Sequence, residues 1–176
     1  MKNFIILLIL QTLLFSCQQK SDSAKTKQFA QTIHDYTHGQ IKASQQEFVN
    51  KLTEDLQTLQ QNHDAVIDTK QLRDLLNKAK QANQLSYNHI KNTTEIDNEI
   101  NLRQKALDEN ELFKSLYNNQ FTKTIEILES NDTNKLEKLS KIINGKLEED
   151  INKVQNASKE ADNEFTNKYN ISFPEG

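Results

Sequence analysis

The chain has 176 residues, of which 27% are charged, 7% are aromatic and none is tryptophan. This length suits one domain, and three glycines and one proline leave little of the chain for tight turns. Basic and acidic residues are interspersed and sum to a formal charge of −3, which argues against the basic patch that nucleic-acid binding requires.

Residues 1–16 have the organisation of a secretory signal peptide. A cation precedes a short apolar run, Phe4–Leu10, which falls short of the roughly 20 apolar residues that span a bilayer stably. The following Leu14-Phe15-Ser16-Cys17 resembles the lipobox of bacterial lipoproteins, with Phe15 where smaller residues are commoner. The resemblance implies cleavage before Cys17 and a diacylglyceryl thioether on its sulfur. Each buried CH₂ of such a lipid contributes about 0.8 kcal/mol, so two or three chains would hold the protein on a membrane.

Cys17 is the only cysteine, so no intrachain disulfide can form and no other thiol is available for catalysis or metal binding. We therefore expect a lipid-anchored protein of the cell envelope. Gln18 stands where some inner-membrane lipoproteins carry Asp, so the same resemblance implies the outer membrane or cell surface if the cell has an outer membrane. Polar residues follow, and we expect a flexible tether over 17–25, a helical domain over 26–173 and a tail over 174–176.

The first helix of this domain is expected over 26–63. Its second half carries one stripe at helical spacing, formed by Ile41, Phe48, Leu52, Leu56, Leu59 and His63. Phe29, Ile33 and Tyr36 share a face that is rotated by about a third of a turn from this stripe at 100° per residue. Gly39 lies between the two registers and is the expected kink point.

The second helix is expected over 70–91, with Asp68 or Thr69 as its N-cap. The third is expected to begin at the cap Thr94 and to end at about residue 129. No segment alternates β-branched and polar residues over a strand's length, so we expect no strand.

The third helix contains a competing signal for a second start. Asp108 and Glu111 have the spacing of a capping box, which would restart the helix at residue 109. We favour one continuous helix because the apolar stripe keeps its phase across that point. The stripe is formed by Ile96, Ile100, Leu107, Tyr117, Phe121, Ile125 and Leu128.

The fourth helix is expected over 134–169, followed by Asn170 as its C-terminal cap. Gly145 lies within it and costs roughly 1 kcal/mol relative to Ala. Because Ile171 and Phe173 are apolar, the tail is expected to fold back onto the helices. Short connections between long amphipathic helices predict an all-α, up-down-up-down four-helix bundle, and a long helical hairpin that pairs with a second chain is the alternative.

Histidines supply the sharpest candidate for a functional site. His34 and His38 are spaced i, i+4, so on a helix they face the same way and can share a metal ion. If the second half of the first helix sets the inner face, both point inward, where His63 also lies. If the first half sets it, both lie on the flank in water. Asp35 stands where the zinc-protease motif needs Glu, and no third ligand follows at an informative spacing.

Other catalytic patterns are missing from the sequence. It holds no Gly-rich phosphate loop and no nucleophile elbow, and no Glu-x-x-His pair for a di-metal site. Tyrosines and phenylalanines inside the helical domain offer a lining for a small apolar ligand; the tyrosines are Tyr36, Tyr87, Tyr117 and Tyr169. We expect a protein that is not an enzyme.

The order of parts resembles a functionally uncharacterised family of helical bacterial surface lipoproteins. The resemblance rests on Cys17, on a long first helix with Tyr36 near its start, and on the run Phe165–Ile171. It implies a surface or periplasmic location and supplies no catalytic residues. We expect a membrane-anchored helical module that binds an envelope protein or polymer, with no cofactor besides the lipid on Cys17. The alternative is a sensor or carrier that holds a metal or a small apolar ligand between the helices.

Overall fold

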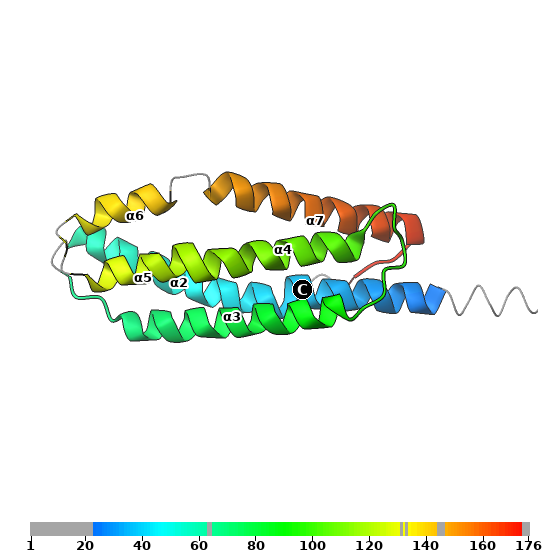
Figure 1. Cartoon of the computed structure of the whole chain (residues 1–176), viewed down its shortest axis with the longest axis horizontal. Helices are drawn as coiled ribbons and strands as arrows, with labels where there is room; N and C mark the ends of the chain where they lie inside the picture. The colour runs from blue at the N-terminus through cyan, green and yellow to red at the C-terminus, as the bar shows by residue number, and fades with distance from the viewer. Residues whose placement is uncertain (1–22, 63–64, 131, 133, 144–146, 174–176) are drawn as a thin grey trace, which may run out of the picture.

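The computed structural model describes residues 23–62, 65–130, 132, 134–143 and 147–173. Over these residues the chain is helical and contains no strand, which confirms the all-α expectation. Figure 1 shows long helices that lie side by side along the long axis of the molecule. Within the described part of the chain, no helix is both long and apolar enough to cross a membrane.

A helix over 23–34 opens the described chain, so residues 23–25, expected in the tether, are helical. The elements that follow are η1 (Asp35–Gly39), α2 (Gln40–Gln61), α3 (Thr69–Lys91), α4 (Leu102–Leu116), η2 (Tyr117–Phe121), α5 (Thr122–Glu129), α6 (Lys135–Ile143) and α7 (Leu147–Tyr169). Two of these, η1 and η2, are π-helical turns, a rare form that often lies at functional sites.

The first π turn explains the change of register in the first helix. A π turn inserts one extra residue into an α-helix, which rotates everything after it by about 100°. This rotation brings the stripe of α2 onto the face that Phe29 and Ile33 occupy, and Ile41 and Phe48 are buried with them. The kink expected at Gly39 is therefore a π turn that ends at Gly39.

Two helix ends lie where the sequence placed them. α3 begins one residue before the expected start, and the Asp68 side chain accepts a hydrogen bond of 3.0 Å from the backbone N–H of Lys70. α7 ends at Tyr169, and Asn170 adopts the left-handed conformation with φ of 51°. The N–H of Ile171 then donates to the carbonyl of Thr166 at 2.8 Å, which closes the helix end.

The expected start of the third helix was wrong, because α4 begins at Leu102 rather than after Thr94. Glu95 accepts hydrogen bonds from three backbone N–H groups (residues 96, 97 and 103), and Asp97 accepts from two (99 and 100). Such bonds offer the backbone a turn in place of a helix. Asn101, with φ of 54°, then directs the chain into α4.

The third helix is continuous through residues 108–111, as expected. It passes from α4 through η2 into α5 without a break in the helical backbone. The fourth expected helix corresponds to α6 and α7. The residues between these two helices, including Gly145, lie outside the described part of the chain.

Two apolar clusters hold the helices together. The larger core joins α2, α3, the α4–η2–α5 segment and α6; its most buried large side chains are Phe48, Leu59, Leu72, Tyr117, Ile125 and Leu139. The smaller core joins the helix over 23–34 to α3, α4 and α7; its most buried are Ile33, Ile90, Leu102 and Phe165. Ile171 and Phe173 pack against the smaller core, so the tail folds back as expected, and Figure 1 shows this turn after α7.

Candidate metal centre

The histidine pair lies where the first helix changes register. His34 is the last residue before η1, and His38 lies inside it. Because Ile33 faces the smaller core, the histidines lie on the flank of the helix, as the second of the two expected registers requires. They are not in open water, however: their side chains are 27% and 35% exposed.

Asp162 of α7 covers this flank and completes a group of three potential ligands. Its Oδ2 lies 3.7 Å from Nδ1 of His34 and 4.0 Å from Nε2 of His38. One donor atom from each of the three side chains can be chosen so that all lie within 4.8 Å of one another. Ligand atoms in a tetrahedral zinc site are about 3.4 Å apart, so a small inward movement of the side chains suffices to hold an ion.

Two atoms of this group are buried and have no hydrogen-bond partner among the described residues. They are Nδ1 of His34 and Oδ1 of Asp162. Unsatisfied buried polar atoms are rare in folded proteins, and each calls for an explanation such as an ion. A metal ion held between the imidazoles and the carboxylate would supply the missing partner.

The electrostatic environment favours the form of histidine that binds metals. Burial lowers the pKa of His38 below its ordinary value of 6.5, and the neighbouring His34 lowers it further. Asp162 partly opposes this shift, while Lys42 and Lys159 add to it. His38 is therefore neutral at pH 7, and a neutral imidazole is the metal ligand.

The π turn is held by hydrogen bonds that other elements supply. Ser86 of α3 donates to the carbonyl of Tyr36 at 2.5 Å, and Ser86 is fully buried. Thr37 donates to the carbonyl of Ile33 at 2.9 Å. These bonds satisfy carbonyl groups near the irregular turn, so the histidines are attached to a fixed piece of backbone.

The site is open on one side and covered on another. A surface hollow of about 620 Å³ is lined by both histidines and gives an ion or a water molecule access to them. On the other side, the ring of Phe173 stacks on His34 with 4.2 Å between ring centroids. This leaves room for a fourth ligand from solvent, while the tail fixes the orientation of one imidazole.

The spacing of the histidines indicates this site in the sequence, whereas Asp162 carries no such signal. Nothing at an informative spacing pointed to it, because it lies on α7, far along the chain from η1. One signal was available in the sequence: Asp162 directly follows Ala161 on the apolar stripe of the fourth helix. Ala161 is buried in the structure, so Asp162 lies beside the buried face of that helix. His63, the third histidine proposed from the sequence, lies outside the described residues, as does Cys17.

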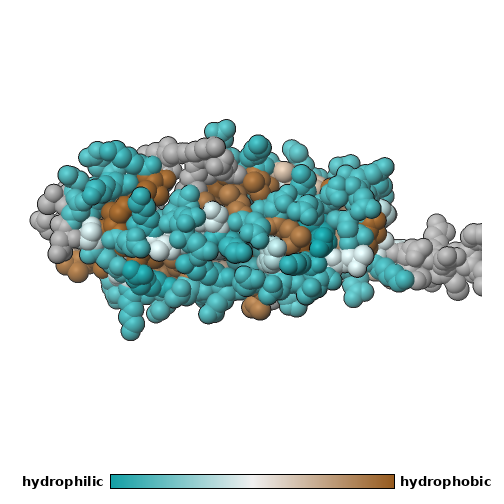
Figure 2. Space-filling view, viewed as in Figure 1, coloured by the Kyte–Doolittle hydropathy of each residue, from teal (hydrophilic) through white to brown (hydrophobic). Residues whose placement is uncertain are grey.

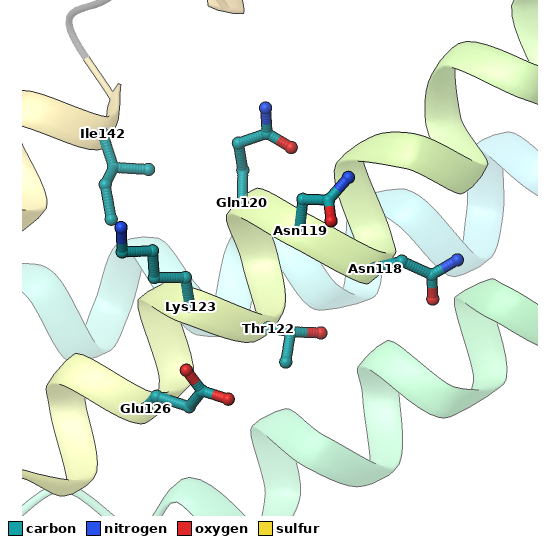
Figure 3. Close-up of a pocket in the computed structure, with 7 residues that line it drawn as sticks. All are labelled: Asn118, Asn119, Gln120, Thr122, Lys123, Glu126 and Ile142. Carbon is teal, nitrogen blue, oxygen red and sulfur yellow. The ribbon is translucent and has the colours of Figure 1, made fainter.

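A second hollow, of about 500 Å³, lies beside η2 and α5 and is lined in part by Asn118, Asn119, Lys123 and Ile142. Figure 3 shows that these side chains point in different directions instead of converging on one point. Asn118, Asn119 and Lys123 are exposed to solvent. The hollow therefore offers no set of ligands comparable with the histidine group.

Comparisons with known proteins place no further constraint on the function. No protein-family model matches this chain, and neither a curated protein nor a solved structure matches it.

Proposed function

We propose that this chain is a lipid-anchored protein of the cell envelope that binds one divalent transition-metal ion through His34, His38 and Asp162. The observation that carries the proposal is the convergence of these side chains with two buried atoms, His34 Nδ1 and Asp162 Oδ1, that have no partner in the described residues. We favour a sensor or carrier over an enzyme, because the other charged side chains that the structure describes around this hollow, Asp35 and Lys42, form no further group of converging ligands.

The donor set indicates the class of metal. Two imidazoles and one carboxylate suit Zn²⁺, Fe²⁺ or Cu²⁺, whereas Mg²⁺ and Ca²⁺ prefer oxygen ligands alone. Three protein ligands with a solvent-facing fourth position leave one coordination site for water or another small ligand. We therefore name Zn²⁺ as the probe of choice.

The geometry gives this reading more support than it gives a partner-binding module. Large apolar side chains that are exposed in the described residues lie on separate segments; they are Val49, Val66, Leu85 and Ile96. Single exposed apolar residues are normal on protein surfaces. As part of the same proposal, the body is an up-down-up-down four-helix bundle, since α3 contacts α2 and α4, and α4 contacts α7.

The metal site is tested by isothermal titration of the full chain in detergent with Zn²⁺. We expect one ion per chain, and binding at least about a hundredfold weaker when His34→Ala is combined with His38→Ala. Asp162→Asn should weaken binding by at least about tenfold. His89→Ala, which removes an exposed histidine outside the group, is the matched control, and His63→Ala shows whether His63 takes part. Unchanged affinity in the double variant would contradict the site.

The anchor is tested separately by labelling producing cells with radioactive palmitate. Label should enter the wild-type chain and be lost in Cys17→Ser, while Ser16→Ala keeps the small residue before the cleavage point and the label. Undiminished labelling of Cys17→Ser would show that the lipobox interpretation is wrong, and it would leave the metal site unaffected.

A further inference from the structure

We propose that the body has a second binding site, an aromatic pocket beside the second π turn, for a small neutral molecule that carries an aromatic ring and one hydrogen-bond acceptor. The pocket encloses about 200 Å³ between α2, the α4–η2 segment and α7. Its lining is formed by Gln45, Phe48, Val49, Phe113, Tyr117, Phe121, Ile151 and Gln155. It shares no lining residue with the hollow beside the histidines.

Aromatic rings dominate the wall of the pocket. The Phe48 and Phe121 ring centroids are 5.1 Å apart, and those of Tyr117 and Phe121 are 5.9 Å apart, both in tilted arrangements. Phe113 follows at 6.1 Å from Tyr117. Rings placed at such distances and angles present both faces and edges, which are the surfaces that a further aromatic ring prefers to contact.

Two polar groups in this apolar wall lack partners among the described residues. Tyr117 is only 1% exposed, yet its hydroxyl forms no hydrogen bond of regular geometry within the described residues, and neither does the buried Nε2 of the neighbouring Gln45. Burial raises the pKa of Tyr117 well above its ordinary value, and the neighbouring Gln45 amide opposes this shift. At neutral pH both groups are therefore donors, and a ligand with an acceptor oxygen satisfies them.

The π turn positions the tyrosine. Tyr117 is the first residue of η2, and its carbonyl accepts a 2.8 Å hydrogen bond from the hydroxyl of Thr122. The turn ends at Phe121, which stands opposite Phe48 of α2. The same irregular turn therefore supplies two rings and one donor to the pocket.

Charge and size narrow the class of ligand. None of the lining residues that the structure describes is acidic or basic, so an ion that enters the pocket gains no charged partner from them in exchange for its water. Its volume is close to that of engineered cavities of about 150 Å³ that bind benzene. We therefore infer a single ring with a carbonyl or ether oxygen, and we use acetophenone as the probe.

The test is titration of the full chain in detergent, followed by the NMR signals of the aromatic rings. Acetophenone should bind, and Tyr117→Phe should weaken its binding about tenfold while leaving the binding of toluene unchanged. Val49→Trp, at a pocket-lining position that is 40% exposed, should block both probes, whereas Leu85→Trp, on the surface of α3, is the matched control. The variant with His34→Ala and His38→Ala should bind acetophenone as the wild type does, so this test is independent of the metal site.

Several outcomes would overturn the proposal. Failure of acetophenone to bind at millimolar concentration would exclude the pocket as a site for this class. Equal affinities of wild type and Tyr117→Phe would exclude the hydroxyl as the recognition group. Binding of tetramethylammonium in place of acetophenone would show that the rings select a cation instead.

Discussion

The two π turns, η1 and η2, have the same irregular backbone but lie beside different kinds of side chain. Beside η1, His34 and His38 lie on the flank of the helix, where α7 adds Asp162. In η2 it accompanies a neutral, aromatic wall with a buried hydroxyl. Near the first turn the unsatisfied atoms belong to an imidazole and a carboxylate, and in the aromatic pocket they belong to a phenol and an amide. The ligand classes inferred for the two sites, a metal ion and a neutral ring, follow from that difference.

The largest expected effect comes from removing the extra residue of each turn in separate variants. Deletion of Gly39 converts η1 to a regular α-helix and keeps the apolar stripes on either side in phase, so the helical content should remain. It keeps the i, i+4 spacing of His34 and His38 but changes the direction of His38 relative to Asp162, and Zn²⁺ affinity should fall at least about tenfold. Deletion of Asn119 in η2 should leave Zn²⁺ binding intact and abolish acetophenone binding.

Circular dichroism and the two titrations check this reciprocal pattern. Loss of both ligands in both deletions, with helical content retained, would show that the two turns do not act separately. A variant that lacks an exposed residue outside both turns serves as the control for the cost of any deletion.

The second effect concerns the bond that holds η1 in place. Ser86→Ala removes a fully buried hydroxyl that donates to the partly buried carbonyl of Tyr36, which should cost about 1–3 kcal/mol of unfolding free energy. Thr122→Val removes the corresponding bond in η2 at a partly exposed position, so the expected loss is smaller. Urea denaturation measures both. A larger loss of unfolding free energy in Thr122→Val than in Ser86→Ala would contradict this prediction.

The sequence pattern indicates the position of η1 but not that of η2. The register change between Ile33 and Ile41 marked the place of η1, although a kink was expected there instead of a π turn. The stripe around Tyr117 kept its phase, so periodicity did not signal η2. Local signals such as the Asp68 cap were reliable, because one side chain satisfies its own neighbours.

Features that depend on distant partners escaped the sequence analysis. The start at Thr94 met every local rule for a cap, yet Glu95 and Asp97 close turns there, and Lys168 of α7 pairs with Asp97 at 2.6 Å. Asp162 belongs to the candidate site for the same kind of reason, since only the packing of α7 on the first helix brings it to the histidines. Contacts between helices carry this information, and spacing along one helix does not.

The third expected effect is moderate: pH should change Zn²⁺ binding at the histidine site but not acetophenone binding in the aromatic pocket. Because burial and the charges of His34, Lys42 and Lys159 depress the pKa of His38, with Asp162 in opposition, the native state resists protonation there. The unfolded chain takes up this proton near pH 6.5, so stability falls as the pH drops from above 6.5 to below the native pKa of His38. Thermal unfolding between pH 5 and pH 8 should show this decline, and Zn²⁺ binding should weaken over the same range.

His38→Gln is the variant that checks the cause, since it should flatten this part of the stability profile. Acetophenone binding should not change between pH 6 and pH 8, because the described lining residues include no carboxylate, histidine or lysine and burial raises the pKa of Tyr117 far above this range. A stability profile equally steep in His38→Gln would assign the decline to another group.

The smallest expected effect concerns Glu109, which contacts α7 between the aromatic pocket and the metal site. Gln155 lines the aromatic pocket, Ser158 follows one turn later on α7, and Asp162 follows one turn after that. Glu109 of α4 bonds with Ser158, and burial raises the pKa of its carboxyl despite this bond. One oxygen of Glu109 is buried without a partner in the described residues.

A raised pKa means that the native state prefers the protonated form of Glu109, so this preference stabilises the fold below about pH 4.5 and is lost as the pH rises through the native pKa. Glu109→Gln keeps a neutral partner for Ser158, and we expect a small rise in the thermal midpoint at pH 7 and none at pH 4. Zn²⁺ and acetophenone affinities should stay at their wild-type values. A change in both affinities would mean that this stretch of α7 couples the two sites, because both depend on the same face of that helix.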